Sequence, residues 1–391
     1  MREPQIHRFL SEHVAANAFP SAVYLVAEKG NVAFHAAIGN AVVEPEIIPA
    51  KKDTIFDLAS LTKVLVTGLV AAKLVEDSEI EIGRSVGSYL PQFDKGAHRH
   101  ITIQSLLTHT SGFQGWKPFY LSPGASEIKS SRKIGVRDDM ASDLVLNDIA
   151  ATEPERDVDV SVVYSDLNFL LLGFLIENIK GVSIDEVWFE TTRELGLDRT
   201  ILGGSELLKR ETAASERGNE SEKQTCIDNG YYADKAAADA SGHFRKDVVW
   251  GEVHDGNAYF LNGIAGHAGL FSTVEGVFKL AQQFLPTYST ILKSETCELF
   301  RTNFTAGLNE HRSFAFQLAS TPESTAGTEM SPQSFGHLGF TGTSLWIDPV
   351  AERVFVLLTN RTHHHPLPFV NTNSIRRQYH NLANAALNAI S

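Results

Sequence analysis

Ser60 and Lys63 lie three positions apart, at the start of an apolar run over residues 61–74. This run is long enough to predict a buried helix, on which side chains three positions apart share one face. A serine hydroxyl becomes an effective nucleophile when a neighbouring base takes its proton. A lysine amine can be that base once it is neutral, and burial lowers the pKa of a lysine. The pair would therefore combine a nucleophile with its base, although Ser-x-x-Lys also occurs at ordinary helix starts.

Two distant segments carry groups that would complement a serine nucleophile. Tyr164, in the Tyr-Ser-Asp segment 164–166, precedes an apolar run that predicts a helix over 167–179. Residues 337–343, His-Leu-Gly-Phe-Thr-Gly-Thr, lead into a predicted strand. A tyrosine can exchange protons with a serine and a lysine. A strand edge of small residues lets a substrate lie alongside and offers an N–H group to an oxyanion. Together the three segments suit acyl transfer.

The surroundings of these motifs resemble the serine β-lactamases and penicillin-binding proteins. The similarity is to the branch that holds class C β-lactamases, family VIII-type esterases and D-aminopeptidases, and Ser-x-x-Lys is a signature of such enzymes. The resemblance spans roughly residues 10 to 390. It rests on five segments: 56–63, 106–112, 164–169, 266–273 and 339–343.

The resemblance implies a role for each of the main residues. Ser60 would be the acylated nucleophile, Lys63 its proton acceptor, and Tyr164 a general base or proton relay. The backbone N–H groups of Ser60 and Phe340 would form the oxyanion hole. Loss of one such donor typically costs about 2.7–4 kcal/mol of transition-state stabilisation, so the geometry of the strand matters as much as the serine.

Asp166, His337 and Gly339 are expected to contact the substrate. Asp166 stands where the family usually has asparagine, so its carboxylate would hold Lys63 charged and favour electrostatic over basic work; alternatively, it caps the following helix. His337 stands where many β-lactamases have a lysine that attracts the substrate carboxylate. A neutral imidazole would do this poorly near pH 7, because its reference pKa is about 6.5. His-x-Gly is more similar to D-aminopeptidases and some esterases, which predicts weak β-lactam turnover at most.

The sequence therefore predicts a serine hydrolase that cleaves an ester or amide bond through an acyl-enzyme on Ser60. Its substrate would be a small ester, amide or β-lactam, and no metal or cofactor is expected. Within enzymes, the alternatives are a D-amino-acid peptidase and a true β-lactamase. A non-catalytic penicillin-binding-protein-like module is a further alternative. The presence of Ser60, Lys63 and Tyr164 together argues against it, because a binding module needs no such set.

The remaining histidines are weaker candidates. His363, His364 and His365 are adjacent and cannot all face one ion, so a polar loop is expected there. His254 and His267 lack the spacing of a helical metal-ligand pair. His267 lies in a glycine-rich turn that could approach the cleft, and His109 is expected to be a buried, hydrogen-bonded loop residue.

The elements that would position these residues come from both ends of the chain. Apolar segments 22–27 and 32–38, around a turn at 29–31, predict a hairpin, and 345–347 and 354–358 predict two more strands. Helices are expected over 61–74, 101–112, 167–179, 183–195, 274–284 and 375–390. The expected fold is α/β of the layered α+β kind, with an antiparallel central sheet, flanking helices and a helical insert.

The length of 391 residues predicts two subdomains. The sheet subdomain would combine residues 1–75 and 255–391, and a mostly helical subdomain would span 76–254. Residues 113–140 are irregular in pattern. Residues 210–245 lack apolar periodicity, which indicates either a mobile loop over a site or a surface insertion, and the insertion is slightly favoured.

Composition excludes several classes of function. The chain is 43% hydrophobic with a net charge of −13 and no basic cluster, which argues against nucleic acid and anionic membranes as partners. Cys226 and Cys297 form no C-x-x-C pair, so neither a zinc knuckle nor a disulfide framework is indicated. The start of the chain lacks the apolar core of a signal peptide, and no apolar run reaches the roughly 18 residues of a membrane span. A cytoplasmic location is expected, or a periplasmic or secreted one if a signal peptide has been removed.

Overall fold

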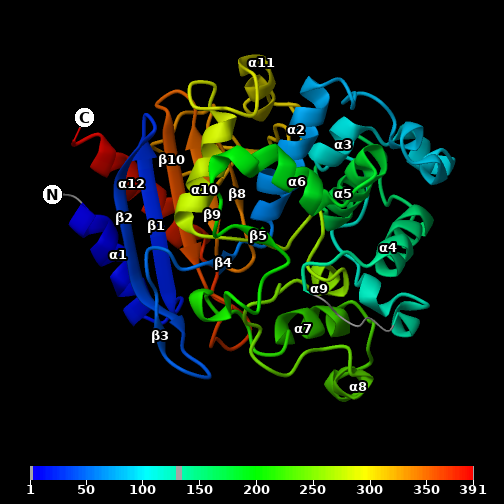
Figure 1. The fold of residues 1–391 in the computed structure, drawn as a ribbon, viewed down its shortest axis with the longest axis horizontal. Coiled ribbons are helices and arrows are strands. Elements are labelled where there is room, and N and C mark those ends of the chain that lie inside the picture. The colour runs from blue at the N-terminus through cyan, green and yellow to red at the C-terminus, as the bar shows by residue number, and fades with distance from the viewer. Residues whose placement is uncertain (1–2, 129–133, 391) are drawn as a thin grey trace.

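A seven-stranded antiparallel sheet forms the centre of the computed structural model (Figure 1). The structure describes residues 3–128 and 134–390; residues 129–133, in the stretch predicted to be irregular, and the extreme chain ends lie outside it. The strand order is β3-β2-β1-β10-β9-β8-β7. The strands are β1 (Ser21–Glu28), β2 (Asn31–Val42), β3 (Ile48–Pro49), β7 (Gln317–Leu318), β8 (Phe335–Leu338), β9 (Ser344–Asp348) and β10 (Arg353–Thr359).

The strands that come first and last along the chain, β1 and β10, are neighbours at the centre of this sheet. β1 forms the predicted hairpin with β2 and pairs on its other edge with β10, where Tyr24 lies opposite Leu357. Side chains of β1 alternate between two apolar cores, with Val23 and Leu25 in one and Tyr24 and Val26 in the other. Burial of each such side chain stabilises the fold by about 1.5–3 kcal/mol. The predicted antiparallel sheet built from both chain ends is therefore confirmed.

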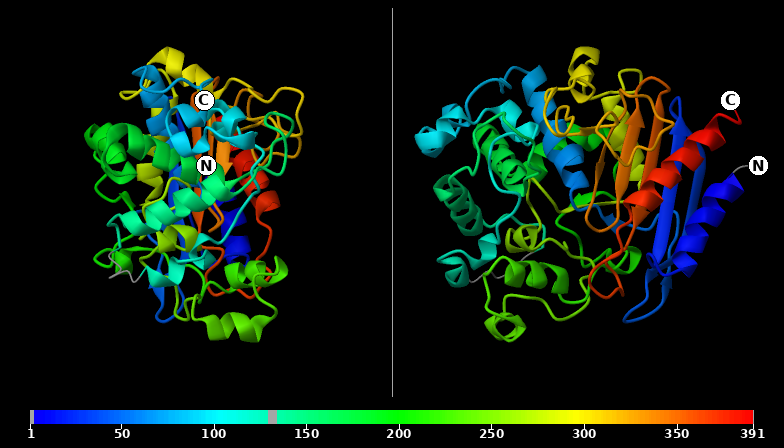
Figure 2. Two further views of the ribbon diagram at one scale, coloured as in Figure 1. Left: turned by 90° about the vertical axis from the view of Figure 1, so that its right-hand side faces the viewer. Right: turned by 180° about the vertical axis from the view of Figure 1, so that it is seen from behind.

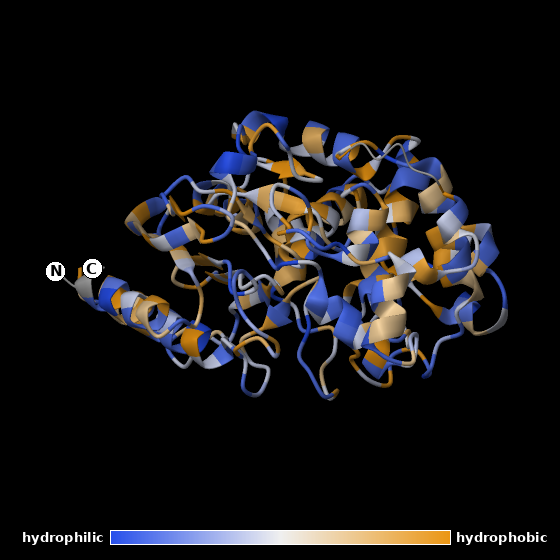
Figure 3. Ribbon diagram, turned by 90° about the horizontal axis from the view of Figure 1, so that it is seen from below, coloured by the Kyte–Doolittle hydropathy of each residue, from blue (hydrophilic) through white to orange (hydrophobic). Residues whose placement is uncertain are grey.

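Helices cover both faces of the sheet. The terminal helices α1 (Glu3–Ala15) and α12 (Asn373–Leu387) lie side by side on one face, and α10 (Val274–Ala281) lies on the other (Figures 1 and 2). In α12, Tyr379 is fully buried and donates a hydrogen bond to the carbonyl of Val356, at 2.9 Å. Figure 3 shows that α1 and α12 carry hydrophobic and hydrophilic residues in alternation along their length. This is the pattern of a helix with one face on a core.

A helical region fills most of the chain between the two halves of the sheet. Its helices, with the neighbouring α11, are α2 (Leu69–Glu76), α3 (Ile103–Leu107), α4 (Asp139–Ala151), α5 (Asp166–Lys180), α6 (Ile184–Thr192), α7 (Glu220–Asp228), α8 (Lys235–Ser241), α9 (Gly256–Phe260) and α11 (Ser294–Cys297). A small second sheet consists of β4 (Phe56–Asp57), β6 (Leu270–Ser272) and β5 (Ile201–Leu202). The boundaries at residues 75 and 255 between two subdomains stay a prediction.

Short 3-10 helices connect many of these elements. They are η2 (Val86–Ser88), η3 (Pro91–Phe93), η4 (Gly96–His100), η5 (Phe119–Leu121), η6 (Ala125–Glu127), η7 (Arg193–Leu195), η8 (Lys209–Glu211), η9 (Gln282–Phe284) and η10 (Glu298–Phe300). Among the described helices, none is by itself long and apolar enough to cross a bilayer; α5 meets that test only together with residues 184–195, across a bend of 77°.

Two predicted helices differ from the observed ones. The helix after Ser60 contains a π-helical segment, η1 (Lys63–Gly68), and continues as an α-helix in α2. Such wide turns are rare and frequently mark functional sites. The helix predicted over 101–112 ends at Leu107, although Thr102 caps it as expected, in a capping box with Ser105. The chain turns away earlier because the next residues hydrogen-bond with the segment that leads into α5, for example the amide of Val163 with the carbonyl of His109.

Candidate active site

Ser60 lies in a tight turn between β4 and η1. The preceding residue, Ala59, has φ of 46°, in the left-handed region that a non-glycine residue adopts at a cost of about 1–2 kcal/mol. Its amide donates a hydrogen bond to Oδ1 of Asp57 at 2.9 Å, and the amide of His254 donates to Oδ2 at 2.8 Å. The turn is therefore held in this conformation by a buried carboxyl group, whose pKa is raised by burial.

Lys63 lies fully buried beneath Ser60. Its Nζ donates hydrogen bonds to Oγ of Ser60 and to the carbonyl of His267, both at 3.0 Å. It also forms an ion pair with Asp166, with 2.7 Å between Nζ and Oδ1. Three acceptor oxygens around one nitrogen suit an ammonium group, which has three protons to donate. Asp166 is the first residue of α5 and points its carboxylate at Lys63, so it is no helix cap, and that alternative is wrong.

The electrostatics of the cluster keep protons on both candidate bases. Burial is the largest influence on the pKa of Lys63 and acts to lower it, but Asp166 and Tyr164 together outweigh burial and raise this pKa. Tyr164 is 36% exposed, yet its phenol lies deep enough that burial raises its pKa; Lys63 opposes the rise and Asp166 adds to it. The phenol lies close enough to Ser60 and Lys63 for both groups to act to lower its pKa. A proton must therefore leave this cluster before Ser60 could act as the predicted nucleophile.

His109 fixes the position of Tyr164. Its ring packs on the Tyr164 ring with 4.6 Å between the centroids, and its Nδ1 accepts a hydrogen bond from the amide of Ser165 at 3.0 Å. Burial, with the nearby positive charges of Arg312 and Lys63, lowers the pKa of His109 well below its usual value. His109 is thus the buried, hydrogen-bonded loop residue that was expected, and it forms one wall of the tyrosine site.

The turn after β8 is fastened to the segment that carries Ser60. Oγ1 of Thr341 donates to the carbonyl of Asp57 at 2.7 Å, and Oγ1 of Thr343 donates to the carbonyl of Leu58 at 3.0 Å. A Cβ atom at Gly339 would lie 2.0 Å from Oγ1 of Thr343 and 2.4 Å from the carbonyl oxygen of Leu58. Only glycine permits this close approach, which brings the turn against the nucleophile segment.

Two backbone donors at this junction are unused. Among the described residues, neither the amide of Ser60 nor that of Phe340 donates a hydrogen bond to a protein acceptor. Phe340 is held by its carbonyl, which accepts a hydrogen bond from Nε of Arg361 at 2.7 Å, and by its ring, which stacks on His254. Free N–H groups are what an oxyanion hole requires. The pairing of these two amides as an oxyanion hole stays a prediction.

His337 is a neutral imidazole. Burial, together with the positive charges of Arg312 and Lys63, lowers its pKa well below the usual value. Its Nδ1 lies 2.9 Å from the carbonyl of Leu338, so Nδ1 carries the proton and Nε2 is left as an acceptor. The expectation that residue 337 cannot supply a positive charge near pH 7 therefore agrees with its surroundings.

A cavity of 480 Å³ lies over this cluster, lined by Ser60, Tyr164 and His337 among others. Ser221, Glu222 and Thr225 of α7 also line it, so the favoured interpretation of residues 210–245 as a surface insertion is wrong. A larger cavity of 960 Å³, between α7, α8 and residues 363–367, contains none of the predicted catalytic residues. The smaller cavity is the candidate substrate site, because the predicted catalytic residues Ser60 and Tyr164 line it.

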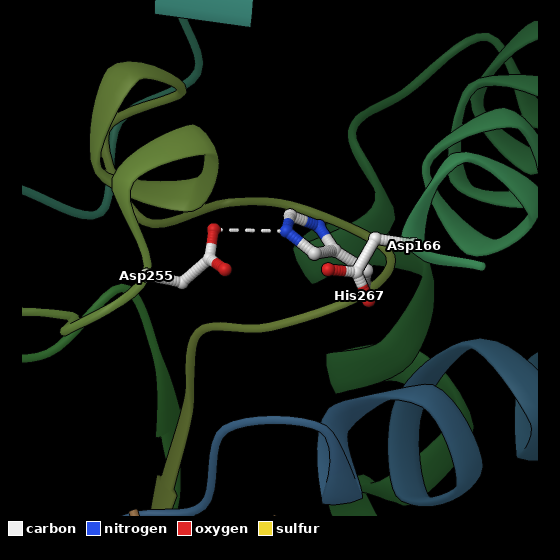
Figure 4. Close-up of side chains that lie close together, drawn as sticks. All are labelled: Asp166, Asp255 and His267. Carbon is white, nitrogen blue, oxygen red and sulfur yellow. Dashed lines mark hydrogen bonds and ion pairs between the residues drawn. The ribbon is translucent and has the colours of Figure 1, made fainter. Parts of the chain in front are cut away.

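Asp166, Asp255 and His267 meet beside Lys63 (Figure 4). One ligand atom from each lies within 4.8 Å of the others, which is close enough to hold a metal ion. Nε2 of His267 lies 2.9 Å from Oδ1 of Asp255, and although burial would raise the pKa of Asp255, His267 lowers it. Each carboxylate thus already has a partner, His267 or Lys63, and the geometry does not require an ion. Catalysis without a metal stays a prediction.

The other histidine candidates have structural positions. His363 is buried and uses both ring nitrogens, accepting from the amide of Val43 at 2.9 Å and donating to the carbonyl of Ser215 at 2.8 Å. Cys226 and Cys297 are both buried and free.

Arg312 lines the cavity, but the sequence analysis assigned it no catalytic or binding role. No motif surrounds Arg312 that could have indicated one.

Comparisons with known proteins find a matching family and similar chains. The profile of the family described as Beta-lactamase matches residues 6–379. A candidate D-alanyl-D-alanine carboxypeptidase of Escherichia coli (strain K12) is 29% identical over 385 residues, which make up 92% of this chain and 82% of that protein.

Solved structures with the same fold include a penicillin-binding protein homologue and a class C β-lactamase. The homologue, an octamer from Pyrococcus abyssi, has a TM-score of 0.71 and 19% identity, covering 100% of this chain and 78% of its own. The class C β-lactamase has a TM-score of 0.69 and 16% identity, covering 100% of this chain and 96% of its own. At these identities the likeness shows the fold, and it confirms the expected one.

Proposed function

This chain belongs to the β-lactamase family, and on that premise we propose that it is a serine hydrolase acting through an acyl-enzyme on Ser60. The observation that carries the proposal is the contact of Oγ of Ser60 with the buried Nζ of Lys63, at 3.0 Å, beneath a cavity. Tyr164 stands beside both groups, and two backbone N–H groups remain unused there. Nucleophile, proton carriers and oxyanion donors are the parts that acyl transfer needs.

The proposed reaction has two stages. In the first, Oγ of Ser60 bonds to the carbonyl carbon of the substrate. The resulting oxyanion accepts hydrogen bonds from the backbone N–H groups of Ser60 and Phe340, and the bond to the leaving alcohol or amine then breaks. The leaving group takes up one proton, and Ser60 has lost one. In the second stage, water attacks the acyl-serine ester, the acid departs, and Ser60 regains its proton.

Asp166 is the proposed acceptor of the proton that Lys63 carries in the resting cluster. In the proposed route, Asp166 accepts a proton from Lys63 across their 2.7 Å contact, and the resulting amine takes the proton of Ser60. Tyr164 passes a proton from Lys63 to the leaving group, since its phenol contacts both Lys63 and Ser60. After hydrolysis, Asp166 returns its proton and the ion pair forms again. The ion pair would thus store the proton rather than prevent its transfer.

Within this class, the site supports ester or amide cleavage with weak β-lactam turnover. His337 carries no charge, so it cannot supply the attraction that many β-lactamases obtain from a lysine at this position. The similarity to a candidate D-alanyl-D-alanine carboxypeptidase supports an amide substrate that contains D-amino acids for this chain. A D-amino-acid peptidase is therefore the second candidate, ahead of a true β-lactamase.

Covalent labelling tests the proposal. The protein is treated with a fluorophosphonate or a labelled penicillin and digested, and the modified peptide is identified by mass spectrometry. We expect the adduct on Ser60, its loss in Ser60→Ala, and its retention in Ser205→Ala, a serine outside the cavity. Absence of any adduct, with no hydrolysis of nitrophenyl esters or nitrocefin, would contradict the proposal and favour a non-catalytic binding module.

A further inference from the structure

His254 is a buried residue of the candidate substrate cavity, 5% exposed, that the proposed reaction does not use. It lies shortly before α9, and its spacing from His267 matches no helical metal-ligand pair. Its backbone and its ring contact two different segments, and each segment carries one of the proposed oxyanion donors. These contacts indicate a role for His254 in the geometry of the oxyanion hole.

The backbone of His254 is joined to the turn that presents Ser60. Its amide donates to Oδ2 of Asp57 at 2.8 Å, while Oδ1 of the same carboxyl group accepts from the amide of Ala59 at 2.9 Å. The strained residue Ala59 directly precedes Ser60, so one buried carboxyl group connects residue 254 to the first oxyanion donor. The carbonyl of His254 accepts from Nδ2 of Asn219 at 2.9 Å, so the backbone of this residue is held on both sides.

The ring of His254 contacts the residue that carries the second oxyanion donor. It stacks on the ring of Phe340, with 5.5 Å between the centroids and 26° between the planes. Such a contact is worth about 0.5–1.5 kcal/mol beyond the burial of apolar area. Phe369 meets the same ring edge-on at 6.0 Å, and the guanidinium carbon of Arg361 lies 5.0 Å from its centre. Both of these residues are more exposed than His254, which is therefore the most buried support of the Phe340 ring.

A buried carboxylate fixes the direction of the His254 ring. Nε2 lies 2.8 Å from Oε2 of Glu216, whose Oε1 accepts from the amide of Ser221 at 2.6 Å, and both side chains of the pair are almost completely buried. Burial is the largest influence on the pKa of His254 and acts to lower it, but Glu216, with Asp57, outweighs burial and raises this pKa. Packing alone does not account for the pair, because apolar residues in place of a buried ion pair often leave a fold equally stable or more stable. The pair instead holds the ring against Phe340.

We propose that His254 is a positioning residue that sets the separation between the amides of Ser60 and Phe340. Its backbone is fixed through Asp57 to one donor segment, and its ring is fixed against the other. An oxyanion donor is effective at about 2.7–3.1 Å from the developing charge, and a displacement of about 1 Å can lower a rate about 10²-fold. The inference rests on the proposed function, since it needs an oxyanion formed at Ser60. The role needs no contact between His254 and the substrate, so kcat should change rather than KM.

The kinetics of His254→Ala test the assignment. The substrate is nitrophenyl acetate, and active sites are counted by the fluorophosphonate bound at Ser60, so that rates refer to folded protein alone. We expect kcat to fall by about tenfold to hundredfold and KM to change by less than about threefold. Phenylboronic acid forms a tetrahedral adduct with a reactive serine, and its inhibition constant should rise by a factor similar to the fall in kcat. A purely structural role would reduce the number of labelled sites and leave kcat per site and this constant unchanged.

Two further variants separate position from charge and from a general loss of packing. Glu216→Gln removes the charge of the pair, but its amide can still hydrogen-bond with the ring of His254, so kcat should stay within about threefold of the unaltered protein. His98→Ala is the matched control. His98 is a buried histidine that packs against two phenylalanine rings outside the cavity, so kcat per labelled site should not change in this variant.

Phe340→Ala removes the same ring contact from its exposed side, which keeps the test decisive if His254→Ala does not fold. It should reproduce the fall in kcat and the weaker inhibition by phenylboronic acid, and adding His254→Ala to it should lower kcat by no more than about threefold further. The assignment is overturned by an unchanged kcat per labelled site in His254→Ala or Phe340→Ala, or by a loss in Glu216→Gln as large as that in His254→Ala. Failure of Ser60 in the unaltered protein to label at all overturns the proposed function instead.

Discussion

Replacing Asp166 by asparagine removes the negative charge that holds Lys63 as an ammonium ion. At 2.7 Å and an effective dielectric constant of about 20, the attraction between the two charges is about 6 kcal/mol. Asparagine retains a hydrogen bond to the ammonium, worth about 1.5–3 kcal/mol. The difference agrees with the loss of about 3–5 kcal/mol usual when one partner of a buried ion pair is removed. We expect Asp166→Asn to lower the free energy of unfolding by this amount near pH 7.

The sign of the pH dependence follows from the direction of the pKa shifts. The pKa of Lys63 is raised in the folded protein, so the ion pair stabilises the fold fully below the pKa of an unfolded lysine, about 10.4, and less as the pH rises through the folded value. Asp166 raises the pKa of both Lys63 and Tyr164. In the proposed route the amine of Lys63 takes the proton of Ser60, and Asp166→Asn removes the group that stores the proton of Lys63, so Lys63 must release this proton to solvent. In Asp166→Asn, kcat/KM should therefore be lower near pH 7 and rise with pH as Lys63 loses its proton.

Two measurements test this reasoning. Urea unfolding gives the change in free energy, and kcat/KM for nitrophenyl acetate between about pH 5 and pH 10 gives the titration of the base. Asp53→Asn is the control, because Asp53 is mostly exposed and lies 3.8 Å from its partner Arg199, so a loss under about 1 kcal/mol is expected. A loss under about 1 kcal/mol in Asp166→Asn, with an unchanged pH profile, would refute the role given to this carboxylate.

Three further outcomes are expected. Lys63→Ala should lower kcat/KM for esters by about 10²–10⁴-fold, and full activity would rule out the paired Ser-Lys mechanism. Gly339→Ala would place Cβ 2.0 Å from Oγ1 of Thr343 and displace the oxyanion segment, so kcat should fall by about 10²–10³-fold, whereas Gly83→Ala, with no heavy atom within 4 Å, should be neutral. Short-chain nitrophenyl esters should be cut faster than nitrocefin. A preference for nitrocefin of about tenfold or more would contradict the interpretation of the uncharged His337.

The reactive cluster and the fold class could be predicted because their signals are local. A run of apolar residues marks α5, and two apolar segments around a turn mark the hairpin of β1 and β2. The separation of three residues between Ser60 and Lys63 predicts that their side chains lie close together, as on one face of a helix. Sequence spacing cannot predict that a distant residue lies beside Ser60. For Tyr164, which is far from Ser60 in the sequence, the prediction came from the resemblance to a known family.

The role of α7 could not be predicted because its stabilisation is not hydrophobic. The helix is fixed by charged contacts, such as those of Lys223 with Glu220 and Asp239, and it buries few apolar side chains. Hydrophobic periodicity, the main signal of a packed helix, is therefore missing. The carboxyl group of Glu222 then joins α7 to the start of α9 through the amide of Gly256.

Arg312 gives no local signal at all. A single arginine in an irregular segment is normally exposed. Its burial depends on Glu310, on Thr305 and on the ring of Tyr164, and these contacts exist only in the folded chain. The π-helix after Ser60 is likewise a consequence of packing, since an apolar run has the same composition in either kind of helix.

The hydrogen bonds from Thr341 and Thr343 to the Ser60 segment also determine when this site can exist. They join positions 284 and 285 residues apart, so Ser60 is synthesised long before the groups that fix its surroundings. Contacts of such long range form late, because closing the intervening loop costs entropy first. A nascent or truncated chain would carry Ser60 without the proposed oxyanion donor, and we expect that it would not be acylated. Reaction of Ser60 with a covalent probe during refolding would therefore time the final closure of the sheet.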